Sequence, residues 1–245
     1  VIDAKSTVVP RCLLSMDAFC QELRAGRPEL TINNDAGHCF QNYMMNEQDG
    51  NRPMVKTDTW KKASMGFYMG MGRPEVACKR LFKDPEAAGK RFNLMRIDQA
   101  LYNAYSSLEG VVLEDVNTLR TFLSSKEMVN SYKSSNFYWY STFACVPQLG
   151  GVKNSHCAAN LGSKIIEEAE AVLSGKSTVR ANLRFGHDSA LMPLLALFNI
   201  NGAGTEIEDF ATLHNQWSVD EYVPMAGNVQ IIFYRSKKDP KSGIL

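Results

Sequence analysis

His187 and Asp188 are adjacent residues whose side chains could do chemistry together. A protonated imidazole can bind the oxygens of a phosphate group, and a protonated carboxyl beside it can deliver a proton to a leaving group. Gly186 precedes the pair and lets the backbone bend. A structural interpretation stays open: a hydrogen-bonded core histidine followed by a helix cap, since a single His-Asp pair is a weak motif.

Arg11 is the next candidate, because it follows Pro10 at the predicted start of a helix that runs to about Arg24. A guanidinium in the first turn can join the free N–H groups of the helix around a phosphate. The alternative is a structural ion pair. The apolar side of this helix is predicted to consist of Cys12, Met16, Phe19, Cys20 and Leu23, with Gly26 ending the helix.

The stretch 179–200 must position His187 and Asp188. Apolar Ala181, Leu183 and Phe185 alternate with polar residues, which predicts a strand. After the pair, a helical spacing of apolar residues predicts a helix, with Asp188 or Ser189 as its N-cap. Ligands of open α/β sheets bind outside the carboxyl ends of the strands, and a helix N-terminus there attracts anions.

Strand patterns occur near both ends of the chain, and helical patterns fill the middle. Strands are predicted within residues 1–9, at Leu30–Asn33, from Val179 and at Val229–Tyr234. We therefore expect an α/β core formed by residues 1–33 and 177–245, with a mostly helical cap at 34–176. A pocket is expected between the two.

Within the middle region, Gly66–Gly72 is rich in glycine and is predicted to be a turn or loop. Helices are expected across 82–108 with an interruption near Pro85, around Leu119, Phe122 and Leu123, and at 163–173. Ser124 and Glu127 have capping-box spacing. The aromatic run 137–140 could line a cleft, but core packing is the more common role of such residues.

Composition places the chain among ordinary globular proteins, with 44% hydrophobic and 22% charged residues and a net charge of +1. No apolar run approaches the roughly 20 residues of a membrane span. The six cysteines form neither a C-x-x-C nor a zinc-binding pattern. Between residues 52 and 96 the sequence contains eleven Lys and Arg residues but only four acidic residues. This excess predicts either an anionic ligand or a solvated basic surface.

Three blocks carry a resemblance to a known family. They are 183–194 (LRFGHDSALMPL), 6–19 (STVVPRCLLSMDAF) and 224–235 (PMAGNVQIIFYR). The first is similar to the His-Asp motif of the histidine acid phosphatases, branch 2 of the histidine phosphatase superfamily. The second resembles the segment in which a phosphate-binding arginine begins a helix. The third resembles a late strand of the phytase-like and inositol-polyphosphate-phosphatase-like members.

The resemblance implies a three-layer α/β core, phosphoglycerate-mutase-like, with an inserted helical cap. It implies a phosphomonoesterase without metal or cofactor, acting through a phosphohistidine on a polyanionic small molecule such as an inositol polyphosphate or phytate. In that mechanism Arg11 and His187 bind the phosphoryl group, and Asp188 protonates the leaving alkoxide. A periplasmic or extracellular location is implied too, and neither a nucleic acid partner nor a membrane span is expected.

The nucleophile of the resembled family lies in an R-H-G-x-R-x-P motif, which this sequence lacks. None of the four histidines (His38, His156, His187, His214) follows an Arg and precedes a Gly. We therefore expect a missing N-terminal segment of the same protein, bound beside 179–187, and no turnover by residues 1–245 alone. The alternatives are a non-catalytic protein that binds a phosphorylated ligand, and phosphoryl transfer or mutase chemistry on the same scaffold.

Overall fold

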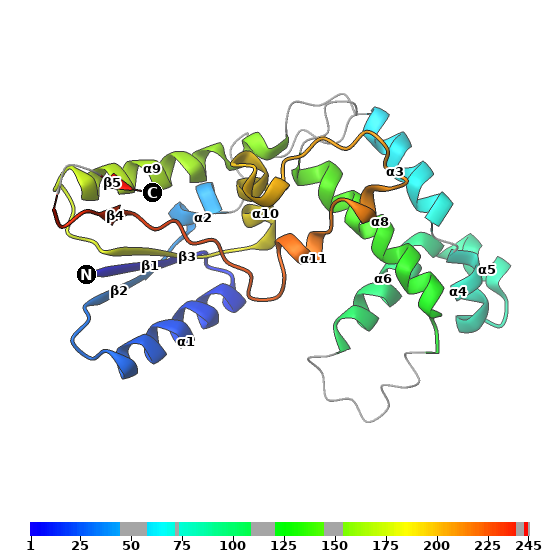
Figure 1. The fold of residues 1–245 in the computed structure, drawn as a ribbon. Coiled ribbons are helices and arrows are strands. Elements are labelled where there is room, and N and C mark those ends of the chain that lie inside the picture. Colours follow the sequence, from blue (N-terminus) through cyan, green and yellow to red (C-terminus); the bar gives the residue numbers. More distant parts are fainter. Residues whose placement is uncertain (45–57, 72–73, 109–120, 145–153, 239–242, 245) are drawn as a thin grey trace.

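A computed structural model describes residues 1–44, 58–71, 74–108, 121–144, 154–238 and 243–244 (Figure 1). Its centre is a parallel sheet of β1 (Ile2–Ser6), β2 (Ile32–Ala36) and β3 (Ala181–Phe185), in the order β2-β1-β3. Ser6 stands opposite Ala36 and Phe185, so the three carboxyl ends are level. Two strands predicted near the N-terminus and one from Val179 are thus confirmed, although β2 begins two residues later than expected.

Helix α1 (Pro10–Gly26) connects β1 to β2 and covers one face of the sheet (Figure 1). Its buried residues Cys12, Met16 and Cys20 follow the predicted apolar side. Met16 and Cys20 share a core cluster with Ile2, Ala4 and Ile32. Phe19 differs from the prediction: its side chain is 52% exposed, although its ring contacts that of Phe185.

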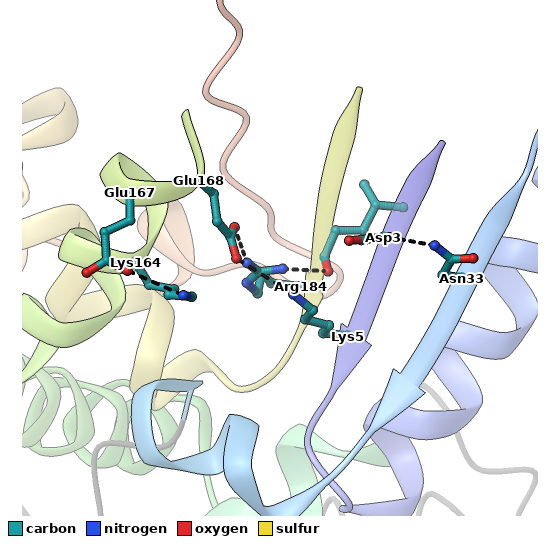
Figure 2. A network of polar contacts seen from close by, with 8 residues as sticks. Asp3, Lys5, Asn33, Lys164, Glu167, Glu168 and Arg184 are labelled. Atoms are coloured by element: carbon teal, nitrogen blue, oxygen red, sulfur yellow. Dashed lines mark hydrogen bonds and ion pairs between the residues drawn. The ribbon is translucent and has the colours of Figure 1, made fainter. Parts of the chain in front are cut away.

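The opposite face of the sheet is polar and lies under α9 (Ala159–Leu173), with α2 (His38–Met44) nearby (Figure 1). Glu168 of α9 binds Lys5 on β1, with 3.7 Å between Nζ and Oε1, and also pairs with Arg184 on β3 (Figure 2). Helices on both faces make the three-layer α/β core that was predicted.

The helical region contains α3 (Asp58–Met71), α4 (Pro74–Leu81), α5 (Pro85–Arg91), α6 (Leu94–Ser106) and α8 (Ser125–Phe143). The interruption near Pro85 and the capping box of Ser124 with Glu127 are confirmed. The aromatic run at 137–140 packs mainly inward, because Phe137 and Tyr140 are buried in the largest core cluster.

Two predictions in this region are wrong. Residues 66–71 belong to α3 rather than to a loop, because the helix buries aromatic side chains: the ring of Phe67 stacks on Phe137, with centroids 4.6 Å apart. Phe122 and Leu123 lie in a turn ahead of the Ser124 cap, not in a helix. The prediction for Leu119 lies outside the described residues.

The chain after β3 forms α10 (Asp188–Leu197), the short turns η4 (Ile200–Gly202) and η5 (Leu213–Asn215), and α11 (Val219–Tyr222). This segment is hydrogen-bonded to α8. Asn136 accepts from the N–H of Val219 at 2.8 Å and donates to the carbonyl of Trp217 at 2.8 Å. The hydroxyl of Tyr140 accepts from the N–H of Ile207 at 2.7 Å. Residues 203–222 therefore pack against the helical region.

The strand predicted at 229–234 is wrong in extent. Only β4 (Tyr234–Arg235) forms, paired antiparallel with β5 (Gly243–Ile244), apart from the three-stranded sheet. Residues 228–233 have no regular structure, and Ile232 and Phe233 are about half exposed. The apolar composition predicted β-propensity, but a strand also needs a neighbour to which its backbone can bond.

Candidate functional site

The predicted site residues meet where β1 and β3 end. The two strands are adjacent and parallel, and the N–H of Thr7 still bonds to the carbonyl of Phe185 at 3.3 Å. Each strand is followed within a few residues by a helix: α1 after β1, and α10 after β3. Two helix N-termini therefore lie at one edge of the sheet, where their free N–H groups favour an anion.

Arg11 and His187 are in direct contact, although 176 positions separate them in the chain. Nη2 of Arg11 donates to Nδ1 of His187 at 3.0 Å. Arg11 is exposed and the histidine is half-buried, so the guanidinium is open to solvent while the ring rests against protein. The sequence predicted both residues separately, and the parallel pairing of β1 with β3 explains why they meet.

His187 occupies the N-cap position of α10, with φ −130° and ψ 154°. The predicted N-caps, Asp188 and Ser189, are thus wrong by one or two residues. The side chain of His187 makes no capping bond, because its ring turns toward Thr7 and Arg11. The structure thereby gives the histidine contacts to residues distant in the chain, which a simple helix cap does not require.

Asp188 is exposed in the first turn of α10, and its Oδ1 accepts the N–H of Ser189 at 2.7 Å. A carboxylate at a helix N-terminus is favoured by the helix dipole. The exposed carboxyl is adjacent in the chain to the contact between Arg11 and His187.

Thr7 and Cys12 also touch His187, and sequence reasoning missed both roles. Oγ1 of Thr7 lies 3.2 Å from Nε2, and Sγ of Cys12 lies 3.8 Å from the same nitrogen. Cys12 also donates to the carbonyl of Gly186 at 3.1 Å. No local sequence signal could have found Thr7, because its contact follows from the register in which Ser6 pairs with Phe185.

Metal-binding groups do not occur in the described part of the chain. No group of three His, Cys, Asp or Glu residues there could hold a metal ion. Burial raises the pKa of the Cys157 thiol to about 12 and also raises that of Cys20, so both stay protonated and unreactive. None of the described helices is long and apolar enough to cross a membrane.

The described basic residues at 52–96 do not form one group near the site. Lys56 and Arg52 lie outside the described residues. Helices α4 and α5 lie at the end of the molecule away from the sheet (Figure 1). Lys79, Lys90 and Arg91 on these helices are exposed there, and Arg80 pairs with Glu127 at 2.7 Å. These side chains are accordingly not part of the cluster around His187.

Comparison with known proteins identifies the family of the chain. The search of curated proteins gives no match. The family model of the histidine phosphatase superfamily (branch 2) matches residues 29–242, which is most of the chain. The matched range contains His187 and Asp188, whereas Thr7 and Arg11 precede it and are joined to the site by the β1–β3 pairing. The chain belongs to branch 2 of the histidine phosphatase superfamily.

Proposed function

We propose that this protein is a phosphomonoesterase whose substrate phosphate binds at Arg11 and His187. The contact of these two residues at the carboxyl ends of adjacent parallel strands carries the proposal. A guanidinium offers planar donors that suit phosphate oxygens, and the two helix N-termini add to the positive potential. Fixed donors of this kind stabilise the charge that builds up on the phosphoryl oxygens during transfer.

Asp188 is the proposed general acid. Two observations support protonation of the leaving alkoxide oxygen by this carboxyl: Asp188 adjoins His187, and it is exposed at the start of α10. Protonating that oxygen removes the cost of expelling a free alkoxide.

The nucleophile is proposed to be a histidine from a segment outside residues 1–245. None of the four histidines present has the Arg-His-Gly context, and His187 is occupied by Arg11 and Thr7. Among the described residues β3 pairs with β1 alone, and the exposed Phe19 on α1 contacts the ring of Phe185, the last residue of β3. A further strand next to β3 would place its carboxyl end at the site. Attack by its histidine would form a phosphohistidine that water hydrolyses.

The proposed substrate class is inositol polyphosphates, including phytate. Support comes from the similarity of residues 224–235 to the phytase-like and inositol-polyphosphate-phosphatase-like members. The test is phosphate release by the full-length protein from inositol hexakisphosphate compared with a simple alkyl monophosphate. Equal kcat/KM for the two substrates would rule out this class and leave the phosphatase assignment intact.

The roles of the site residues have their own test in the full-length enzyme. Arg11→Ala and His187→Ala should weaken inhibition by vanadate and slow turnover, since both residues bind the phosphoryl group. Asp188→Asn should slow turnover of an alkyl phosphate far more than that of p-nitrophenyl phosphate, whose leaving group needs little protonation. Equal losses on both substrates would exclude Asp188 as the acid.

A non-catalytic phosphate-binding protein is the second candidate, favoured by the absence of the Arg-His-Gly context around all four histidines. It predicts binding of phosphate by the full-length protein, dependent on Arg11 and His187, without turnover. Acid-labile labelling of a histidine by a phosphorylated substrate would decide for the enzyme.

A further inference from the structure

The polar atoms around His187 define the tautomer of its neutral ring. An arginine side chain has only donors, so Nδ1, which faces Nη2 of Arg11 at 3.0 Å, must present its lone pair. The ring proton of a neutral imidazole then resides on Nε2. This N–H points at Oγ1 of Thr7 at 3.2 Å, and the hydroxyl oxygen accepts it.

Binding of one phosphoryl group by both residues changes this arrangement. Nη2 of Arg11 turns to the anion, which frees Nδ1 of His187. A bare Nδ1 lone pair would repel a phosphate oxygen, so Nδ1 must carry a proton to bind the anion, and a doubly protonated ring adds a positive charge to that bond. Both ring nitrogens then donate: Nδ1 to the anion and Nε2 to Thr7. A bond from a cationic imidazole to a hydroxyl is stronger than that from a neutral one.

On the basis of the proposed phosphate site, we propose that Thr7 is a positioning residue for His187. Its hydroxyl accepts Nε2–H, directs Nδ1 at the anion position and stabilises the charged ring, which is the form that binds an anion most strongly. Thr7 is fully buried, and its N–H is bonded to the carbonyl of Phe185, so its hydroxyl oxygen has a fixed place relative to β3. It does not touch the phosphate; it acts through His187.

The surroundings of the ring set the direction of the pH effect. Arg11 and Cys12 of α1 face the ring, Thr7 approaches it from the end of β1, and Asp188 follows it in α10. Arg11 opposes protonation while it stays on Nδ1, whereas Thr7 favours the cation. Removing the Thr7 acceptor should therefore lower the pH at which the ring is half protonated. The pH at which anion affinity falls should be lowered by the same amount.

The test compares three variants of the full-length protein. Thr7→Val keeps the shape and removes the hydroxyl, whereas Thr7→Ser keeps the hydroxyl. Ser6→Ala is the matched control, because Ser6 is equally buried but its hydroxyl donates to the carbonyl of Thr7 at 2.8 Å, away from the ring. Sulfate is the probe, since its charge stays constant while histidine titrates. Its affinity is measured across pH by calorimetry, and His187 is followed by NMR.

For Thr7→Val we expect the midpoint of His187 titration and of the fall in sulfate affinity to drop by about one pH unit, with about tenfold weaker binding above it. Thr7→Ser should restore the wild-type profile, and Ser6→Ala should lower stability without moving the midpoint.

A Thr7→Val profile that coincides with wild type would overturn the positioning role while leaving the phosphate site standing. So would an equal loss of affinity at every pH, which indicates structural damage alone. If wild-type protein shows no Arg11-dependent sulfate binding at any pH, the proposed function itself fails, and this inference fails with it.

Discussion

The two faces of the central sheet are held in different ways. On the α1 face, Ile2, Ala4 and Ile32 pack with Met16 and Cys20, and the contacts are apolar. On the α9 face, charged and amide side chains bond one another instead (Figure 2). Parallel sheets are usually apolar on both faces, because helices bury both. Here apolar and polar side chains alternate along the strands, and α9, on the polar face, is attached through ion pairs.

The charged face depends on Glu168. Its carboxylate bonds Lys5 and Arg184, which are in-register neighbours on β1 and β3, so one anion holds two adjacent cations. The side chains of Lys5 and Glu168 are 23% and 16% exposed, so water screens these charges only in part. At the far edge, Nδ2 of Asn33 donates to Oδ1 of Asp3 at 2.9 Å. Removing Glu168 would leave like charges side by side under a helix.

The largest effect is expected on the apolar face. Met16→Ala should lower the free energy of unfolding by about 2–5 kcal/mol, because it removes buried surface and leaves a cavity next to Ile2 and Cys20. Urea unfolding followed by circular dichroism measures it. Leu14→Ser is the control, since Leu14 is 70% exposed on the same helix and should change stability by less than about 0.5 kcal/mol. Similar losses for both variants would contradict the packing described for α1.

The charged face should respond less to mutation and more to salt. Glu168→Gln should cost about 1–3 kcal/mol, because Lys5 and Arg184 lose their shared counter-charge. Adding Arg184→Met to this variant should recover part of the loss, since the like-charge contact is gone. Added salt should reduce the difference in unfolding free energy between wild type and Glu168→Gln. The corresponding difference for Met16→Ala should not change with salt. A salt-independent difference for Glu168→Gln would mean that shape rather than charge matters there.

The spacing of apolar residues, with the signals for helix ends, was enough to predict both β1 and β3 and the helix that follows each. It was enough because a strand and a helix have different apolar periods, and each segment carries only one of them. The three-layer core followed from the resemblance and is confirmed. The prediction failed at 229–234, because this apolar segment pairs with no strand of the described three-stranded sheet. It also failed at 66–71, where glycines stay helical because Phe67 packs on Phe137.

The site was predictable in its parts but not in its contacts. Local patterns placed His187 and Arg11 each at the start of a helix after a strand. Their mutual bond, and the contact of Thr7 with the ring, depend on which strands are neighbours and in which register. Register is set by pairing across 180 residues of chain between Thr7 and His187, which no local pattern records. The division into core at 1–33 and 177–245 and cap at 34–176 stays a prediction. The Glu168 contacts and the bonds of Asn136 to Trp217 and Val219 both cross it.

The smallest effect is expected from a charged contact in the helical region, where Glu127 joins α8 to α4. Its carboxylate accepts from Arg80 and from the N–H and hydroxyl of Ser124. Burial alone would raise the pKa of Glu127, but these bonds outweigh it and hold the pKa below the usual value of 4.5. The unfolded chain therefore takes up the proton first. The contribution to stability is complete above about pH 4.5 and is lost as pH falls through the lower pKa of the folded state.

Glu127→Gln should thus be less stable than wild type near neutral pH by about 0.5–1.5 kcal/mol, and the two should converge in acid. Urea unfolding at a series of pH values measures this difference. The apolar contact tested by Met16→Ala has no charge, so the deficit of that variant should stay nearly constant over the same series. A Glu127→Gln deficit that persists at the acid end would show that the capping geometry, rather than the ionised carboxylate, holds α8 to α4.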